Sequence, residues 1–132
     1  MKAIMAINNL NYIGLNDKLP WKCSEDLKHF KKLTSYQRLI VGYNTAQNLP
    51  KLENRTIIVD TKPHPAFPFA QLTNGLDWCI GGAKTYEKYC HLFTELHISH
   101  INDNTIGDIV APELKNLNEK CKIFRYFFEP DR

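Results

Sequence analysis

Short runs of apolar residues recur along the chain, separated by turn-rich stretches and by segments of helical character. The continuous apolar runs at 3–7 and 39–41 are typical of strands that are covered on both faces. The same pattern predicts strands at 3–7, 39–41, 56–59, 77–80, 96–101 and 122–128. Helical spacing predicts helices that begin at Ser24 and that cover 43–48 and 83–90. Strands that alternate with short helices indicate an α/β fold, with a central, mostly parallel, twisted sheet flanked by short helices.

One stretch, 60–75, interrupts this alternation. It contains Pro63, Pro65 and Pro68 and has no helical periodicity. Because a parallel crossover usually needs a helix, we expect an extended surface loop here instead. Neither side of the stretch is long enough to fold alone, and 132 residues suit one domain, so we expect a single domain over 1–132.

The composition is that of an ordinary soluble globular protein, with 43% hydrophobic and 23% charged residues. The formal net charge is +3 without a dense basic block, so nucleic acid is not expected as a partner. No apolar run approaches the length of a membrane span, and the first residues lack a signal-peptide pattern, which predicts a cytoplasmic protein. The four cysteines form no C-x-x-C pair, so we expect free thiols and no metal site.

The stretch 13–30 has the pattern of a loop followed by the start of a helix. Gly14 and Pro20 are typical loop residues. Ser24 is a favourable N-cap residue, and Asp26 lies in the first helical turn, where the helix dipole favours negative charge. We therefore expect Ser24 to cap a helix whose first turn carries Asp26.

Asp26 borders the apolar side of this helix, because Leu27 and Phe30 follow it at close helical spacing. Trp21 approaches the same region from the loop. A carboxylate surrounded by such groups is poorly solvated, which predicts a raised pKa. The alternative is that Asp26 faces water and only complements the helix dipole, as acids of the first turn commonly do. We expect His29 to face solvent.

Two predicted strand-to-helix turns contain glycine, at 41–45 and 80–84. Glycine lets the backbone approach a ligand closely, and a helix N-terminus offers N–H groups to a phosphate. At the carboxyl ends of parallel strands, two such turns are suited to holding a pyrophosphate between them. Each turn alone is weak evidence, and the chain has no G-x-G-x-x-G fingerprint.

Over nearly the whole chain, the order and spacing of these features resemble the dihydrofolate reductase family. The resemblance makes Asp26 the acid beside the substrate and 14–21 a mobile loop over the nicotinamide, with Gly107-Asp108 in a loop that steadies it. It implies reduction of 7,8-dihydrofolate to tetrahydrofolate, with hydride transfer from NADPH to C6 and protonation at N5. It also implies a monomer that serves one-carbon metabolism and binds antifolate inhibitors.

The resemblance implies three overlapping sets of site residues. The catalytic residues are Trp21, Asp26, Tyr86 and Ser99. The substrate-binding residues are Ile4, Ala6, Asp26, Leu27, Phe30, Lys31, Arg55, Ile80, Tyr86 and Ser99. The cofactor-binding residues are Ala6, Ile13, Gly14, Leu19, Gly42, Tyr43, Thr45, Thr61, Lys62, Ile80, Gly81, Gly82, Ala83, Lys84, Thr85 and Tyr86. The role implied for Arg55 is to grip the glutamate carboxylate of the substrate, for which a guanidinium is well suited.

The chain departs from the family pattern mainly on the cofactor side. Tyr43 stands where a basic residue often meets the NADP 2′-phosphate, whereas Thr61-Lys62 match a pair used for that phosphate. Asp60 beside them is unfavourable because it repels a phosphate. Two alternatives therefore stay open: a folate-binding protein of the same fold with little turnover, and a pyrimidine reductase of riboflavin synthesis. The spacing of Trp21, Asp26 and Phe30, together with Arg55, argues against the second.

Overall fold

The computed structural model describes residues 1–60 and 77–132. Its strands are β1 (Lys2–Asn8), β2 (Tyr12–Gly14), β3 (Arg38–Gly42), β4 (Thr56–Asp60), β5 (Asp77–Cys79), β6 (Glu95–Ile101), β7 (Ile109–Val110) and β8 (Lys122–Phe128). Its helices are α1 (Ser24–Thr34), α2 (Tyr43–Gln47) and α4 (Ala83–Tyr89), and a short 3-10 turn, η1 (Cys90–Leu92), follows α4. The strands and helices predicted from the sequence are confirmed, with bounds that differ by at most one residue at either end.

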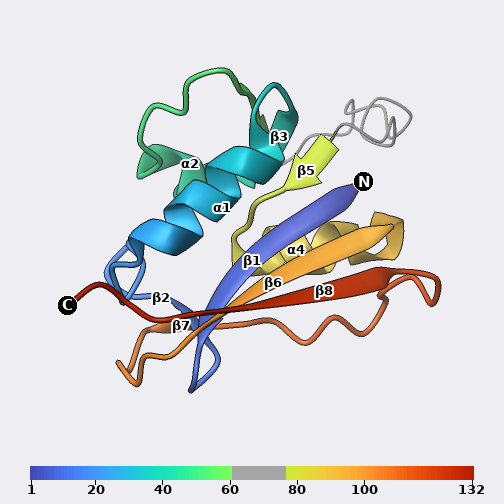
Figure 1. The fold of residues 1–132 in the computed structure, drawn as a ribbon. Helices are drawn as coiled ribbons and strands as arrows, with labels where there is room; N and C mark the ends of the chain where they lie inside the picture. The colour runs from blue at the N-terminus through green and yellow to red at the C-terminus, as the bar shows by residue number, and fades with distance from the viewer. Residues whose placement is uncertain (61–76) are drawn as a thin grey trace.

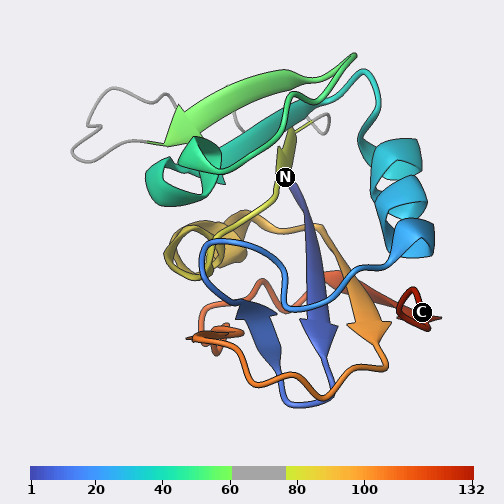
Figure 2. The same cartoon turned by 90° about the vertical axis from the view of Figure 1, so that its left-hand side faces the viewer.

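The main sheet has six strands in the order β4-β3-β5-β1-β6-β8 (Figure 1). Every described pairing within this sheet is parallel, which confirms the predicted fold class. A second, antiparallel pair joins β2 to β7 beside the carboxyl end of β1 (Figure 2). The apolar pattern did not predict this pair, because strands of three and two residues are too short to show a period.

Helices α1 and α4 lie on opposite faces of the sheet (Figures 1 and 2). The central strand β1 serves both faces, because successive side chains of a strand point to opposite sides. Ala3 and Met5 pack on the α4 side, whereas Ile4 packs with Phe30 of α1. We call these two sides the α4 face and the α1 face.

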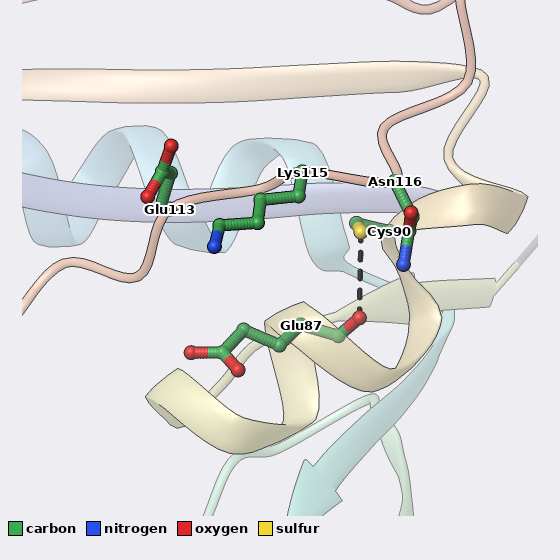
Figure 3. A pocket seen from close by; sticks show the side chains of 5 residues that line it. All are labelled: Glu87, Cys90, Glu113, Lys115 and Asn116. Atoms are coloured by element: carbon green, nitrogen blue, oxygen red, sulfur yellow. Dashed lines mark hydrogen bonds between the residues drawn. The ribbon is translucent and has the colours of Figure 1, made fainter.

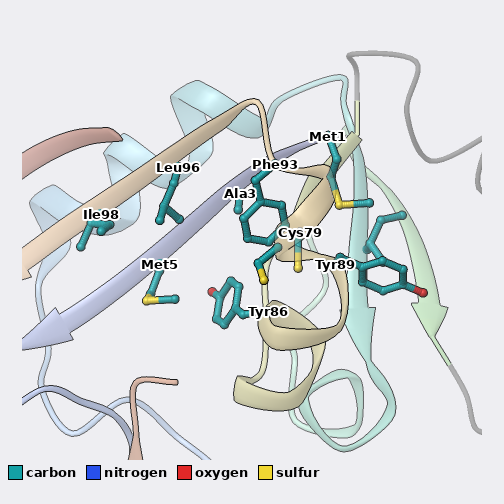
Figure 4. Packing of buried hydrophobic residues seen from close by; sticks show 11 residues of the cluster. Met1, Ala3, Met5, Cys79, Tyr86, Tyr89, Phe93, Leu96 and Ile98 are labelled. Atoms are coloured by element: carbon teal, nitrogen blue, oxygen red, sulfur yellow. The ribbon is translucent and has the colours of Figure 1, made fainter. Parts of the chain in front are cut away.

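The largest apolar cluster lies on the α4 face (Figure 4). Tyr86 and Tyr89 of α4 belong to this cluster together with Met5 of β1 and Leu96 of β6, and Phe93 is 0% exposed. Full burial of an apolar side chain of this size stabilises the fold by about 1.5–3 kcal/mol. This cluster anchors α4 to the sheet and so fixes the position of the turn that precedes α4.

The start of α1 differs from the sequence prediction. Cys23 occupies the N-cap position, and within the described residues no side-chain hydrogen bond caps the helix in the usual local manner. Ser24 instead donates from Oγ to Asp131 Oδ2 at 2.6 Å, and its backbone N–H donates to Asp131 Oδ1 at 3.0 Å. The expectation that Ser24 caps α1 is therefore wrong. A carboxylate from the C-terminal end of the chain takes that role at the positive end of the helix dipole.

Three further sequence expectations concern membrane spans, the cysteines and the proline-containing stretch. Among the described residues, the helices are too short and too polar for any of them to be a candidate membrane span. All four cysteines, Cys23, Cys79, Cys90 and Cys121, are free. Asp60 ends β4, and the remainder of the proline-containing stretch lies outside the described residues.

Candidate active site

Asp26 lies in the first turn of α1 and is only 6% exposed. Burial raises the pKa of its carboxyl above the ordinary value of 3.8, and the nearby Ser99 hydroxyl and His29 partly offset this by lowering it. The predicted raised pKa is thus confirmed, and the alternative of a solvent-facing acid is wrong. A buried carboxyl whose neutral form is accessible is characteristic of functional sites rather than of plain helix starts.

Two buried polar atoms on the α1 side of the sheet have no hydrogen-bond partner within the part of the chain that the structure describes. Ser99 lies on β6 in register with Ala6 of β1, and its side chain points to the face that α1 covers. Ser99 Oγ and Trp21 Nε1 are both buried and have no hydrogen-bond partner among the described residues. Trp21 packs with Ile101 next to Ala6. Because buried polar groups normally have partners, this arrangement fits a polar ligand that would supply them.

An apolar wall completes this side of the site. Ile4, Phe30 and Ile80, which the sequence assigned to the substrate, all pack in one cluster with Leu39 and Trp78. Such a wall suits one face of a flat heterocycle. Leu52 also packs there. Sequence reasoning missed Leu52, because a single leucine in a loop carries no periodic signal.

Leu27 lies on a different side of α1 from the apolar wall. It is 57% exposed, so it is not buried against the sheet as its helical spacing suggested. The angular step of about 100° per residue explains the difference, since Leu27 follows directly after the inward-facing Asp26. Leu27 remains an exposed apolar side chain beside the acid.

Arg55 is held at the far end of α1. Its Nη1 donates a 3.3 Å hydrogen bond to Thr34 Oγ1, and its guanidinium carbon lies 5.9 Å from the centre of the Phe30 ring. Its Nε is buried and has no partner in the described part of the chain. The predicted second cation, Lys31, is exposed on the same helix. Arg55 therefore stands at the end of the apolar wall, with a nitrogen available for an anionic group.

The two glycine turns lie against each other at the carboxyl ends of β3 and β5. The Gly42 N–H donates to the Gly81 carbonyl oxygen at 2.8 Å. A Cβ at Gly42 would stand 2.5 Å from Thr85 Oγ1, and a Cβ at Gly82 would stand 3.0 Å from Thr45 Oγ1. Gly81 has φ +108°, which L side chains rarely adopt. Glycine is thus required by close approach at Gly42 and by backbone conformation at Gly81.

The helices that follow these turns begin without side-chain caps. Gly42 is the N-cap of α2 and Gly82 is the N-cap of α4, and neither position shows a side-chain cap in the described residues. Two uncapped helix starts in adjoining turns fit the phosphates of a dinucleotide. The backbone of both turns is therefore compatible with the cofactor that the sequence predicted.

The remaining predicted cofactor residues differ in their surroundings. Tyr43 and Lys84 are exposed, Ala83 is half-buried, and Thr85 is buried beside Gly42. Tyr86 is buried and donates from its hydroxyl to the Ile4 carbonyl oxygen at 2.6 Å, which links α4 to β1. Burial raises the pKa of Tyr86 well above its ordinary value, so its hydroxyl stays protonated. The predicted pair Thr61 and Lys62 lies outside the described residues.

The loop between β2 and α1 turns tightly before it reaches the site. Leu15 and Lys18 exchange backbone hydrogen bonds of 2.8 and 3.0 Å, and Asn16 and Asp17 between them have φ 50° and 64°. Positive φ at both central residues is the backbone form of a type I′ turn, for which Asn and Asp are favoured. Leu19, after this turn, is 45% exposed.

A second segment holds the base of this loop. Asp108 donates its backbone N–H to the Gly14 carbonyl oxygen at 2.9 Å and accepts the Asn16 N–H on Oδ2 at 3.0 Å. A Cβ at Gly107 would collide with the Gly14 carbonyl oxygen. Ile13 is half-buried next to Gly14. Gly107 and Asp108 thus contact the loop in the way the family resemblance implied.

His29 is not solvent-facing, contrary to the sequence expectation. Its ring centre lies 4.1 Å from that of Tyr126 and 5.5 Å from that of Phe128, and its Nε2 is buried. Burial lowers the pKa of His29 below 6.5. His97, on the same face, accepts or donates a 2.8 Å hydrogen bond with the Tyr126 hydroxyl. These rings form a layer of aromatic and imidazole groups on the same face as Asp26. The layer depends on residues of β8, so the local sequence around His29 does not predict it.

One surface hollow of about 400 Å³ lies elsewhere on the molecule (Figure 3). It is lined by Glu87, Cys90, Glu113, Lys115 and Asn116. Cys90 belongs to the apolar cluster of the α4 face, so this hollow is on the opposite side of the sheet from Asp26. The buried Asp26 carboxyl and the apolar wall, both on the α1 face, identify the candidate active site, and this hollow does not.

Dihydrofolate reductases are among the known proteins that resemble this chain. The family model described as dihydrofolate reductase matches residues 1–124. Dihydrofolate reductase of Buchnera aphidicola subsp. Schizaphis graminum is 32% identical over an aligned length of 142 residues. The alignment covers 97% of this chain and 86% of that protein. Dihydrofolate reductase of Bacillus subtilis is 30% identical over 131 residues, covering 89% of this chain and 78% of the relative.

A solved structure is similar as well. Dihydrofolate reductase from Enterococcus faecalis, complexed with NADP(H) and RAB-propyl, superposes with a TM-score of 0.75 and is 27% identical in sequence. The match covers 86% of this chain and 77% of that one. The resemblance therefore extends from the sequence to the backbone of nearly the whole described fold.

Proposed function

The chain belongs to the dihydrofolate reductase family, and on this premise we propose that it reduces 7,8-dihydrofolate to tetrahydrofolate with NADPH. The observation that carries the proposal is the Asp26 carboxyl, which is 6% exposed and has a pKa raised by burial. An acid that holds its proton more readily than usual suits a reaction in which a proton is added to the substrate. The chain is accordingly an NADPH-dependent oxidoreductase.

Asp26 is the group that would orient the pterin. Its carboxyl would accept hydrogen bonds from the amino group and the ring N–H of the pterin, and would thereby raise the basicity of N5. Water would carry the proton to N5. Ser99 and Trp21 support this role, since their buried polar atoms lack partners within the described residues. Tyr86 acts by holding β1 through its hydrogen bond to Ile4.

The remainder of the substrate would extend along α1. Ile4, Phe30 and Ile80 form the apolar wall on which the heterocycle would lie. Arg55, at the end of that wall, would pair with the glutamate carboxylate through two parallel hydrogen bonds. Leu27 and Lys31, both exposed on α1, would flank the ring and the glutamate tail respectively. Inhibitors that mimic the folate ring would bind the same wall.

NADPH fits the two glycine turns. A side chain at Gly42 would clash with Thr85 and one at Gly81 would be strained, while a Cβ at Gly82 would come within 3.0 Å of Thr45 Oγ1. The helices behind these turns start uncapped in the described chain. These turns, with Thr45 and Thr85, would hold the pyrophosphate. Bound NADPH would supply the hydride for C6 of the pterin. Ala6, Ile13, Gly14 and Leu19 would border the nicotinamide, while Tyr43, Ala83 and Lys84 would lie along the remainder of the cofactor.

The loop between β2 and α1 would close over the reacting rings. Its tight turn at Leu15–Lys18 is anchored to Gly107 and Asp108 at the base, whereas Leu19 is left exposed. Closure would exclude water from the site and so strengthen the electrostatic effect of Asp26. We propose that one chain, folded as a single domain over 1–132, carries out the reaction as a monomer.

The proposal is tested by incubating the purified chain with dihydrofolate and following the absorbance of NADPH. We expect oxidation of NADPH that depends on dihydrofolate and yields tetrahydrofolate, with slower oxidation of NADH. Tight binding of dihydrofolate without turnover would instead support the alternative of a folate-binding protein. Turnover of a riboflavin-pathway pyrimidine in place of dihydrofolate would support the other alternative. Size-exclusion chromatography with light scattering tests the monomer.

A further inference from the structure

Asp60 lies beside the first glycine turn of the proposed cofactor site. It is the last residue of β4 and pairs in register with Gly42, the first glycine of the cofactor turn on β3. An acidic residue beside a dinucleotide-binding turn typically accepts hydrogen bonds from the ribose 2′-hydroxyl and so selects NADH. The same charge repels a 2′-phosphate. Taken alone, the position of Asp60 conflicts with a preference for NADPH.

Lys88 resolves this conflict in the structure. Its Nζ donates to both carboxylate oxygens of Asp60, at 2.8 Å to Oδ2 and 3.1 Å to Oδ1. The Asp60 side chain is 6% exposed, whereas that of Lys88 is 46% exposed. Both Asp60 oxygens are therefore occupied by a cation, and the carboxylate is largely shielded from water.

Tyr89 contributes to holding the ammonium group in place. Lys88 Nζ lies 5.1 Å from the centre of the Tyr89 ring, within range of a cation–π contact. Burial lowers the pKa of Lys88, but its hydrogen bonds and electrostatic interactions with Asp60 and Tyr89 raise it by more. Lys88 stays protonated at neutral pH, and the Asp60–Lys88 pair has no net charge.

From this geometry, and given the proposed function, we propose that Lys88 determines cofactor specificity by neutralising Asp60. With the pair intact, Asp60 neither repels a 2′-phosphate nor has an oxygen free for a 2′-hydroxyl. Without Lys88, the carboxylate would regain both effects next to the cofactor turn. Lys88 thus acts through Asp60 and favours a nucleotide that carries a 2′-phosphate.

Two other roles for Lys88 make different predictions. If Lys88 formed only an ordinary surface ion pair, it would contribute little to the binding of any ligand, because water screens such pairs. A lysine that binds the phosphate directly would be needed whether or not Asp60 is charged. A double-mutant cycle separates these roles, since only neutralisation makes the effect of losing Lys88 depend on Asp60.

The test measures binding of 2′,5′-ADP and of 5′-AMP by calorimetry, which does not require turnover. The variants are Lys88→Met, Asp60→Asn and the double variant, and the control is Lys115→Met, an exposed lysine on the α4 face. We expect Lys88→Met to weaken 2′,5′-ADP binding by about 10-fold and to leave 5′-AMP binding unchanged or stronger, because the freed Asp60 carboxylate repels a 2′-phosphate but can accept a hydrogen bond from a 2′-hydroxyl. The double variant should bind 2′,5′-ADP within about 3-fold of the wild type, and Lys115→Met should match the wild type.

Besides the absence of any effect of Lys88→Met, two results would overturn the inference: an equal loss for both nucleotides, and failure of Asp60→Asn to rescue the loss. The double variant leaves no buried charge unpaired, so a loss of 2′,5′-ADP binding in this variant overturns the inference even if Lys88→Met does not fold. If the wild-type chain binds 2′,5′-ADP but Lys88→Met changes nothing, only this inference fails. If the wild type binds neither nucleotide, the proposed NADPH dependence fails with it.

Discussion

Arg55 is tied to Thr34 by a 3.3 Å hydrogen bond from Nη1 to Oγ1. Thr34 in turn donates from the same oxygen to the Phe30 carbonyl oxygen at 2.7 Å. The loop before β4 is thereby fixed to the last turn of α1, and the guanidinium is held over the Phe30 ring. This contact places the cation at the end of the wall on which the substrate would lie.

Replacing Arg55 by lysine should weaken substrate binding selectively. A lysine keeps the positive charge but loses the planar fork that pairs with a carboxylate through two hydrogen bonds. We expect the KM for dihydrofolate to rise by about 10-fold or more, because hydrogen bonds to charged groups contribute roughly 1.5–3 kcal/mol. Steady-state kinetics with varied dihydrofolate measures the change.

The matched control for Arg55→Lys is a substrate without the glutamate tail. Reduction of 7,8-dihydropterin should have the same KM in the wild type and in the variant, since the tail is the only part that Arg55 would contact. An equal loss with both substrates would contradict the assigned role and would indicate a general disturbance of α1.

Gly107→Ala should slow turnover without unfolding the chain. A Cβ at Gly107 would collide with the Gly14 carbonyl oxygen and approach Tyr12, so the base of the loop must shift. Displacing a catalytic loop by a fraction of an ångström commonly costs about 10-fold or more in rate. We expect kcat to fall by about that factor, with an unchanged circular dichroism spectrum.

The neighbouring residue Ile106 provides the control for this loop variant. It is 70% exposed, so Ile106→Ala should leave kcat unchanged. A wild-type kcat for Gly107→Ala would show that the contact between the two loops has no part in turnover.

The ionised carboxylate of Asp26 should lower the free energy of unfolding at neutral pH. Its carboxyl is more easily protonated in the folded chain than in the unfolded chain, whose Asp pKa is near 3.8. The folded state therefore binds more protons in the window above 3.8, and stability falls as pH rises through the folded pKa. Asp26→Asn should raise Tm at neutral pH, and the difference should vanish below pH 3.8. Thermal unfolding of both proteins at several pH values measures this.

A lower Tm for Asp26→Asn at neutral pH would contradict this account, because it would mean that the ionised carboxylate stabilises the fold. The expected opposition between activity and stability is common where an acid is kept buried for function.

The inner strands β1 and β3 of the main sheet were predictable because each contains a run of apolar residues that is mostly buried. Leu39, Ile40 and Val41, for example, are all 0% exposed. The β2–β7 pair was not predictable, since its strands are short and depend on a contact between segments far apart in sequence. The cap on α1 was mispredicted for the same reason: Ser24 meets Asp131 only in the folded chain.

In the candidate site, too, features with a local sequence signal were predictable and contacts between distant segments were not. Asp26, Phe30 and the glycine turns carry local signals, in helix position and in turn chemistry, and the structure packs Ile80, which precedes the second glycine turn, with Phe30. The contacts that tune them come from distant elements. His29 meets Tyr126 of β8, and Asp60 meets Lys88 of α4. A single sequence gives no indication of such pairs, because neither residue type nor spacing encodes them.

The most direct test of the account is kcat/KM for dihydrofolate, measured with NADPH across pH for the wild type and for Asp26→Asn. General acid–base groups typically contribute at least about 100-fold, so we expect the variant to lose about that much at neutral pH while binding NADPH normally. A variant that keeps the wild-type rate and the wild-type pH profile would contradict the central role of Asp26.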